Sequence, residues 1–163
     1  MNKKNKIIFL DVDGVLNCPT TKDRVGDCLG VDERKVALFS TLVLRSRAKI
    51  VLTSTWKDGW YKRKADKIKQ DEFGDRPDSA LGKFSLEIYA KTRDNALERG
   101  AGIKAWLRGK KVDTFVILDD VQFDYDAQDL TPYWVKTDPK HGLTVADVIR
   151  AESILCGKEK TDR

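Results

Sequence analysis

The stretch IIFLDVDGVLN, residues 7–17, places two carboxylates directly after four apolar residues. A short apolar run that contains β-branched side chains is typical of a strand buried on both faces. Asp11 and Asp13 follow this run, and their spacing of two lets them share one side of the extended chain. Gly14 then allows a sharp turn, because glycine has no Cβ to clash. The stretch therefore predicts a strand that carries a pair of acids at its carboxyl end.

Strands and helices alternate along the rest of the chain. Further apolar runs predict strands at 50–52, 115–118 and 133–136. Amphipathic spacing predicts helices over about 33–47, 103–108 and 145–156. Strands that alternate with helices predict an α/β fold, in which a central parallel sheet carries helices on both faces.

Residues 56–98 differ from this pattern, because they are polar, charged and poor in long apolar runs. Within them, EFGDRPDS at 72–79 combines glycine, proline and aspartate, and we expect it to form a loop. Residues 57–69 carry six basic and two acidic side chains. We interpret residues 56–98 as a basic insertion on a single domain that spans residues 1–163.

Size and composition limit the possible classes of protein. A chain of 163 residues with 40% hydrophobic content is long enough to bury one core and too short for two. The 31 Lys and Arg residues exceed the 26 Asp and Glu residues by five, which favours anionic partners such as phosphates or nucleic acid. The N-terminal apolar run is too short for a signal-peptide core or a membrane span. We therefore expect a cytoplasmic protein with no membrane contact.

The cysteines do not form a recognisable metal motif. Cys18, Cys28 and Cys156 include no CxxC pair, and His141 is the one histidine of the sequence. This spacing excludes a common Cys/His zinc site. We expect all three cysteines to be reduced thiols, as in other cytoplasmic proteins.

Polar residues follow each of the first three predicted strands. In an open parallel sheet, ligands bind outside the carboxyl ends of the strands, so these residues are expected to meet. They are Asp11 and Asp13, Thr53 and Ser54, and Asp119 and Asp120. So many carboxylates repel one another unless a cation is present, and hard oxygen ligands suit Mg²⁺. A calcium loop of the EF-hand type is excluded, because its acidic positions fall on Val15 and Lys22.

Three motifs in this order resemble the signatures of the haloacid dehalogenase (HAD) superfamily: DVDGV at 11–15, IVLTS at 50–54 and VILDDVQFD at 116–124. The chain is similar above all to the small HAD phosphatase domains associated with RNA-repair proteins, from residue 7 to about 156. The likeness is weakest over about 58–98. It implies a HAD-like Rossmannoid three-layer sandwich with a central parallel sheet and only small cap insertions. It also implies a phosphatase that forms an aspartyl-phosphate.

The resemblance implies a role for each acid. Asp11 would be the nucleophile, and Asp13 the general acid for the leaving oxygen and then the base for water. Mg²⁺ would be held by Asp11, the backbone carbonyl of Asp13, and Asp120 or Asp119. Asp124 keeps a DxxxD spacing from Asp120, and is either a further metal ligand or a surface residue.

The resemblance also indicates how phosphate would be bound. Thr53 would donate a hydrogen bond to a phosphoryl oxygen, and Ser54, one residue further on, is the second candidate. Arg99, in the RG before the helix at 103–108, would supply the cation of the third HAD motif. The alternatives nearby are Lys91, Arg93 and Lys104.

The site is expected to be open to large substrates such as a phosphorylated nucleic-acid end, because the gaps between the motifs leave no room for a large cap domain over it. The segment WKDGWYKRKADKIK, residues 56–69, interleaves aromatic side chains with lysines. This favours contact of Trp56 and Lys57 with the bases and phosphates of a nucleic-acid end. The alternative interpretation is an amphipathic helix with a solvated basic face and a tryptophan in the core.

Three functions are therefore compatible with the sequence. The first is a Mg²⁺-dependent phosphatase acting on polynucleotide ends. The second is a phosphatase of small metabolites or mononucleotides. The third is a non-catalytic nucleic-acid-binding module, which the predicted anionic crevice disfavours because it would repel phosphates.

Overall fold

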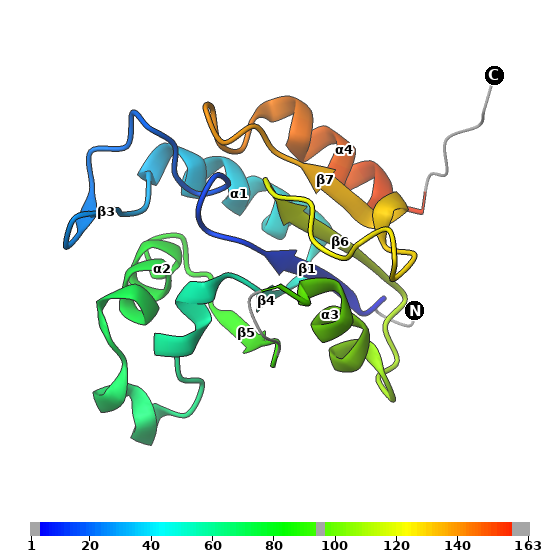
Figure 1. Cartoon of the computed structure of the whole chain (residues 1–163), viewed down its shortest axis with the longest axis horizontal. Helices are drawn as coiled ribbons and strands as arrows, with labels where there is room; N and C mark the ends of the chain where they lie inside the picture. The colour runs from blue at the N-terminus through cyan, green and yellow to red at the C-terminus, as the bar shows by residue number, and fades with distance from the viewer. Residues whose placement is uncertain (1–3, 94–96, 158–163) are drawn as a thin grey trace.

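The computed structural model describes residues 4–93 and 97–157 and contains a five-stranded parallel sheet in the order β5-β4-β1-β6-β7 (Figure 1). The strands are β1 Lys6–Leu10, β4 Lys49–Leu52, β5 Ile88–Lys91, β6 Thr114–Asp119 and β7 Trp134–Lys136. Every neighbouring pair in this sheet is parallel. The four strands predicted from the sequence are confirmed, and β5 is an addition.

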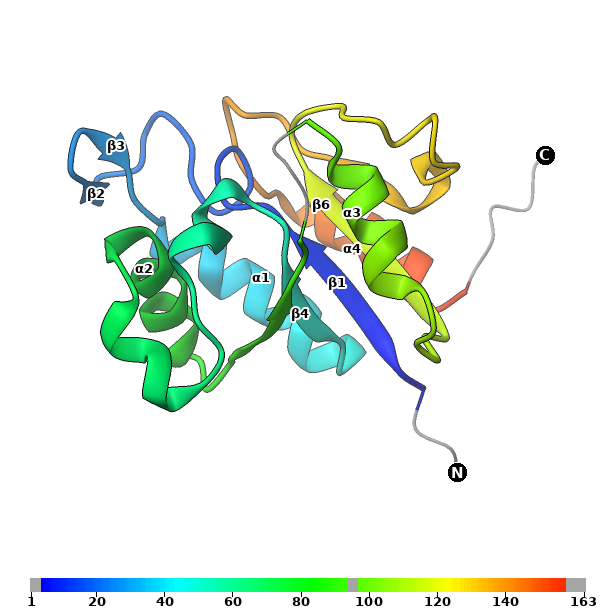
Figure 2. The same ribbon diagram turned by 60° about the horizontal axis from the view of Figure 1, so that its bottom comes forward.

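Helices cover both faces of the sheet. Helices α1 (Glu33–Ser46) and α4 (Val145–Leu155) lie on one face, and α3 (Arg99–Leu107) lies on the other (Figures 1 and 2). The side chains of β1 alternate accordingly, since Ile8 and Leu10 join the core on the α1 side and Ile7 and Phe9 join the core on the α3 side. The predicted three-layer α/β architecture is confirmed. Burial on both faces is the reason that the strands have continuous apolar sequences.

A two-stranded antiparallel hairpin, β2 (Arg24–Val25) with β3 (Cys28–Leu29), lies between β1 and α1 in the chain. It is found at the left of Figure 1, above α2 (Glu72–Gly82). Arg76 of α2 forms an ion pair with Asp23, the residue before this hairpin. These elements therefore pack together beside the sheet.

Helix α2 corrects the prediction of a loop at 72–79. Asp71 caps this helix by accepting a hydrogen bond of 2.9 Å from the backbone N–H of Gly74. Gly74 lies so close to the preceding segment that a Cβ there would come within 2.1 Å of the carbonyl oxygen of Gly59. Pro77 is buried inside the helix. Gly74 and Pro77 therefore lie in packed positions of a helix, whereas the sequence pattern predicted that they belong to a loop.

Residues 56–98 also include part of the sheet itself. The segment contains two 3₁₀ helices, η1 (Thr55–Gly59) and η2 (Lys64–Lys69), then α2, and then β5. Strand β5 pairs in parallel with β4, with a register shift between Ile50 and Val51. The segment is therefore not wholly an insertion, because its last strand forms one edge of the central sheet. Within the described residues, no helix is both long enough and apolar enough to cross a bilayer.

Candidate active site

Three acids meet where β1 and β6 end. Asp11 follows β1 directly, and its backbone N–H donates a hydrogen bond of 3.0 Å to the carbonyl oxygen of Leu118 in β6. Asp119 is the last residue of β6, and Asp120 follows it. One carboxylate oxygen from each of these three acids lies within 4.8 Å of the other two. The parallel pairing of β1 with β6 thus produces the meeting of acids that the sequence predicted.

Burial makes this cluster electrostatically costly. Asp11 is 5% exposed and Asp119 is fully buried. Burial, followed by the negative charge of Asp119, raises the pKa of Asp11 from its ordinary 3.8 to about 7. Burial and Asp119 also raise the pKa of Asp120. Carboxylates held this close together favour a bound cation, and their oxygens are the ligands that Mg²⁺ prefers.

Arg99 supplies a positive charge to the cluster. Its Nη1 lies 2.5 Å from Oδ2 of Asp119 and 3.3 Å from Oδ1 of Asp11. Burial alone would lower the pKa of this guanidinium, but the charges of Asp11 and Asp119 raise it well above its usual range. Its guanidinium carbon also lies 4.1 Å from the centre of the Phe123 ring. Arg99 is therefore held as a permanent cation beside the acids.

Among the described residues, none of the competing cations forms an ion pair with Asp11 or Asp119, as Arg99 does. Lys91 donates hydrogen bonds of 2.6 and 2.7 Å to the carbonyl oxygens of Lys57 and Trp60. Arg93 and Lys104 are exposed. Arg99 is the first residue of α3, so this helix begins four residues before the predicted position. The reason is that Gly100, Ala101 and Gly102 lack the apolar stripe by which a helix is predicted.

Both oxygens of the Asp119 carboxylate accept hydrogen bonds from protein groups. Its Oδ2 accepts hydrogen bonds from Arg99 and from the hydroxyl of Tyr125, the latter at 2.8 Å. Its Oδ1 accepts one of 3.0 Å from the backbone N–H of Val121. Burial and the charge of Asp119 strongly raise the pKa of Tyr125, so this phenol remains a donor. The sequence alone did not identify Tyr125 as a site residue. The one feature that could have indicated it is an aromatic side chain within the acid-rich stretch after β6.

Gly14 lets the turn after β1 approach Asp120. Its φ is +70°, and a Cβ there would lie 2.3 Å from Oδ2 of Asp120. The hydroxyl of Thr137 donates a hydrogen bond of 2.7 Å to the Gly14 carbonyl oxygen. An L side chain at this position would both strain the backbone and enter the acid cluster.

Thr53 places a buried hydroxyl at the end of β4, the strand beside β1. Its backbone N–H donates a hydrogen bond of 2.9 Å to the Leu10 carbonyl oxygen. Its Oγ1 is buried and has no hydrogen-bond partner within the described residues. A buried hydroxyl without a partner is costly, so this atom is suited to bind a ligand.

The family assignment agrees with this geometry. A family model described as the HAD domain in Swiss Army Knife RNA repair proteins matches residues 7–148. The chain belongs to this family. No curated protein and no solved structure matches it. The resemblance inferred from DVDGV, IVLTS and VILDDVQFD is thereby confirmed, and the fold is that of a HAD domain. Membership supports a phosphatase-type function in general terms.

In this HAD domain, Asp13 has a different environment from Asp11. It is exposed, and both of its carboxylate oxygens accept hydrogen bonds. The side-chain amide of Asn17 donates to Oδ1 at 2.8 Å, and Nε1 of Trp56 donates to Oδ2 at 2.9 Å. Asn17 is buried and also accepts a hydrogen bond from the backbone N–H of Gly14. Neither donor was predicted, although the asparagine belongs to the same quoted stretch, DVDGVLN.

The burial of Trp56 corrects one expectation about the substrate. Trp56 and Trp60 are only 4% and 2% exposed, and Trp56 packs edge-on against Phe73. Their ring faces are therefore not available for stacking on bases. Lys57 is also buried and donates a hydrogen bond of 3.3 Å to the Thr53 carbonyl oxygen. The alternative interpretation, a tryptophan in the core, describes this segment better, since both tryptophans are buried, although the segment forms 3₁₀ turns in place of an amphipathic helix.

The structure also gives two candidate site residues local roles. The two carboxylate oxygens of Asp124 accept hydrogen bonds of 2.6 and 2.9 Å from the backbone N–H groups of Gly100 and Ala101. Asp124 therefore caps α3 and lies outside the cluster of Asp11, Asp119 and Asp120. Ser54 caps η1, since its hydroxyl accepts a hydrogen bond from the backbone N–H of Trp56.

Proposed function

We propose that this HAD domain is a Mg²⁺-dependent phosphatase that forms an aspartyl-phosphate on Asp11 and acts on phosphorylated nucleic-acid ends. The observation that carries the proposal is the meeting of three carboxylates with Arg99 at the ends of β1 and β6. The hydroxyl of Thr53, which has no hydrogen-bond partner among the residues that the structure describes, lies at the end of the adjacent strand, β4. Together these groups match the needs of phosphoryl transfer, which are a nucleophile, charge neutralisation and donors for phosphoryl oxygens.

The donor set fits Mg²⁺. Asp11 and Asp120 would be its side-chain ligands, with the backbone carbonyl of Asp13 as a third. The carboxylate of Asp119 is already engaged by Arg99, Tyr125 and Val121, so its role would be to hold Arg99 in place. When bound, Mg²⁺ would offset the negative charge of the nucleophile and of the substrate phosphate.

The protein's own groups account for both halves of the reaction. A carboxylate oxygen of Asp11 forms a bond to phosphorus while the bond from phosphorus to the ester oxygen breaks. The leaving oxygen takes a proton from Asp13. Water then attacks the phosphorus of the aspartyl-phosphate and gives a proton to Asp13, and the bond to Asp11 breaks. Inorganic phosphate is released, and both aspartates return to their starting states.

The hydrogen bonds to Asp13 suit this role. Trp56 and Asn17 fix both oxygens of an otherwise exposed side chain, so its carboxyl group is oriented before substrate arrives. The Thr53 hydroxyl would donate to a phosphoryl oxygen, and Arg99 would stabilise the negative charge that develops there.

Two observations support nucleic acid as the substrate class. The family description refers to RNA repair proteins, and the chain carries a net charge of +5.

The three cysteines form no disulfide, which agrees with a proposed cytoplasmic location.

Phosphate release tests the proposal. The substrates to compare are nitrophenyl phosphate, mononucleotides, and oligonucleotides with a terminal 3′- or 5′-phosphate, each with Mg²⁺ and with a chelator. We expect release that requires Mg²⁺ and a higher kcat/KM for an oligonucleotide. Equal turnover of mononucleotides and oligonucleotides, with no effect of salt on the latter, would instead favour a small-molecule phosphatase.

A further inference from the structure

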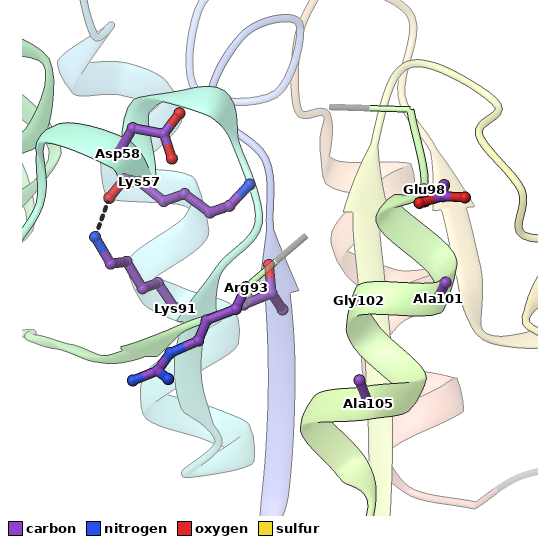
Figure 3. A pocket seen from close by; sticks show the side chains of 9 residues that line it. Lys57, Asp58, Lys91, Arg93, Glu98, Ala101, Gly102 and Ala105 are labelled. Atoms are coloured by element: carbon purple, nitrogen blue, oxygen red, sulfur yellow. Dashed lines mark hydrogen bonds between the residues drawn. The ribbon is translucent and has the colours of Figure 1, made fainter. Parts of the chain in front are cut away.

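A pocket of about 590 Å³ opens between η1, the end of β5 and α3 (Figure 3). Lys57 and Asp58 of η1 and Lys91 of β5 form one wall, and Ala101, Gly102 and Ala105 of α3 form the other. Arg93 and Glu98 also line it. The small side chains of α3 leave room for a flat or bulky group to approach the helix closely.

Both walls of the pocket lead to the proposed phosphoryl site. On one wall, Lys57 donates a hydrogen bond to the carbonyl oxygen of Thr53, whose hydroxyl has no partner within the described residues. On the other wall, Glu98 immediately precedes Arg99, which contacts Asp11 and Asp119. A phosphate held by Thr53 and Arg99 would therefore have the rest of its molecule in or beside the pocket.

The charge of the pocket favours an anion. Three cationic side chains, Lys57, Lys91 and Arg93, line it against two anionic ones, Asp58 and Glu98. Lys91 is fixed by the carbonyl oxygens of Lys57 and Trp60, and Arg93 is exposed. A cation fixed as Lys91 is can bind a phosphate without a large loss of side-chain entropy.

Aromatic rings continue from the pocket along the edge strand β5. The Lys91 ammonium lies 5.2 Å from the centre of the Tyr61 ring. The ammonium of Lys62, the residue after Tyr61, lies 4.1 Å from the centre of the Tyr89 ring. The ammonium of Lys49 lies 4.7 Å from the centre of the same ring. Tyr89 is 38% exposed. Cations and aromatic rings thus alternate outward from the site.

We infer that the pocket and this edge, defined by Lys91, Arg93, Tyr61 and Tyr89, bind the nucleotides that adjoin the phosphate attacked by Asp11. The inference rests on the proposed phosphatase function and specifies its substrate as a single-stranded end. A small phosphate ester needs only Thr53 and Arg99, whereas alternating cations and rings suit successive phosphodiesters and bases. Tyr61 and Tyr89 would stack on the bases in place of Trp56 and Trp60, whose rings are buried.

Substrate discrimination by an Arg93→Gln variant tests this inference. For each protein, kcat/KM is measured with an oligonucleotide bearing a terminal phosphate and with nitrophenyl phosphate, and the ratio is compared with that of the wild type. We expect the ratio to fall about tenfold in Arg93→Gln, because one phosphate contact is lost. The matched control is Arg108→Gln, which removes an exposed arginine at the opposite end of α3 and should leave the ratio within about twofold.

Direct binding of a fluorescent oligonucleotide, measured by anisotropy over a range of salt concentrations, provides a second test that does not require turnover. Arg93→Gln should weaken binding and lower the slope of log K against log salt by about one. Tyr89→Ala should weaken binding about tenfold, and Tyr89→Phe, which keeps the ring, should restore it.

The outcomes separate the two proposals. If the wild type releases phosphate from neither nitrophenyl phosphate nor the oligonucleotide in the presence of Mg²⁺, the proposed phosphatase function fails, and anisotropy still tests the pocket. If nitrophenyl phosphate is hydrolysed but Arg93→Gln changes neither the ratio nor oligonucleotide binding, the pocket inference alone is overturned. Failure of the wild type to bind any oligonucleotide would also overturn it.

Discussion

Nε1 of Trp56 donates a hydrogen bond of 2.9 Å to Oδ2 of Asp13, although 43 positions separate the two residues in the chain. The bond joins a side chain of the core to the one exposed carboxylate of the DVDGV motif. Its effect is to fix the direction of Asp13, which is the proposed proton donor. The tryptophan is therefore expected to affect catalysis through Asp13 without touching the substrate.

Replacing Trp56 by phenylalanine removes this donor while keeping an aromatic ring in the core. We expect kcat for an alkyl phosphate to fall about tenfold, because that leaving group needs a well-placed acid. The loss should be smaller for nitrophenyl phosphate, whose leaving group needs little protonation. Steady-state kinetics over a series of leaving groups provides the measurement.

Trp60→Phe is the matched control, because Trp60 is equally buried and its Nε1 donates a hydrogen bond of 2.9 Å to Asp78. Both variants should lose a similar amount of stability, about 1–3 kcal/mol. If Trp60→Phe lowers kcat in the same leaving-group-dependent way, the positioning role of Trp56 is wrong.

Asp11→Asn should abolish turnover and change the pH dependence of stability. We expect kcat to fall at least about a thousandfold, because an amide is a poor nucleophile.

In the metal-free fold, the pKa of Asp11 is raised to about 7 from 3.8. The folded chain therefore retains a proton that the unfolded chain releases, and the stabilising effect of that proton is lost as pH rises from about 4 to about 7.

Thermal unfolding in a chelator checks this sign. The melting temperature of Asp11→Asn should exceed that of the wild type by a few degrees at pH 8, and this advantage should shrink toward pH 5. A difference that does not change with pH would contradict the raised pKa of Asp11.

Mg²⁺ should stabilise the wild type through Asp120. A ligand that binds only the folded state raises the melting temperature, and we expect this shift to be lost in Asp120→Asn. Asp124→Ala should lower the melting temperature through loss of the cap of α3, about 1 kcal/mol, while keeping the Mg²⁺ shift. Loss of the Mg²⁺-induced shift in melting temperature in Asp124→Ala would indicate that Asp124 is a metal ligand.

Gly14→Ala should damage the site beyond its effect on the backbone. Gly14 and Gly26 have φ values of +70° and +57°, so alanine at either position costs about 1–2 kcal/mol in the left-handed region. A Cβ at Gly14 would collide with Asp120, whereas none of the described atoms lies within 4 Å of a Cβ at Gly26. We therefore expect Gly14→Ala, and not Gly26→Ala, to lose Mg²⁺-dependent activity. Equal activity of the two variants would contradict the role of this close approach.

The sequence by itself was sufficient to predict four of the five strands of the central sheet and the acids at its edge. The apolar runs of β1, β4 and β6 mark strands buried on both faces, and parallel pairing brings their carboxyl ends together. Asp11, Thr53 and Asp119 could therefore be placed at one edge from local patterns alone. The same patterns carried the family resemblance.

Only the tertiary structure decided which partner each side chain has. The hydrogen bonds from Trp56 to Asp13 and from Tyr125 to Asp119, and the cap of α3 by Asp124, depend on how elements pack. Gly74 of α2 lies against Gly59 of η1, and Pro77 is buried within the same helix, although glycine and proline in a sequence usually indicate a turn or loop. Hydrophobic periodicity reports which face of an element is buried, but it carries no information about which distant atom that face will meet.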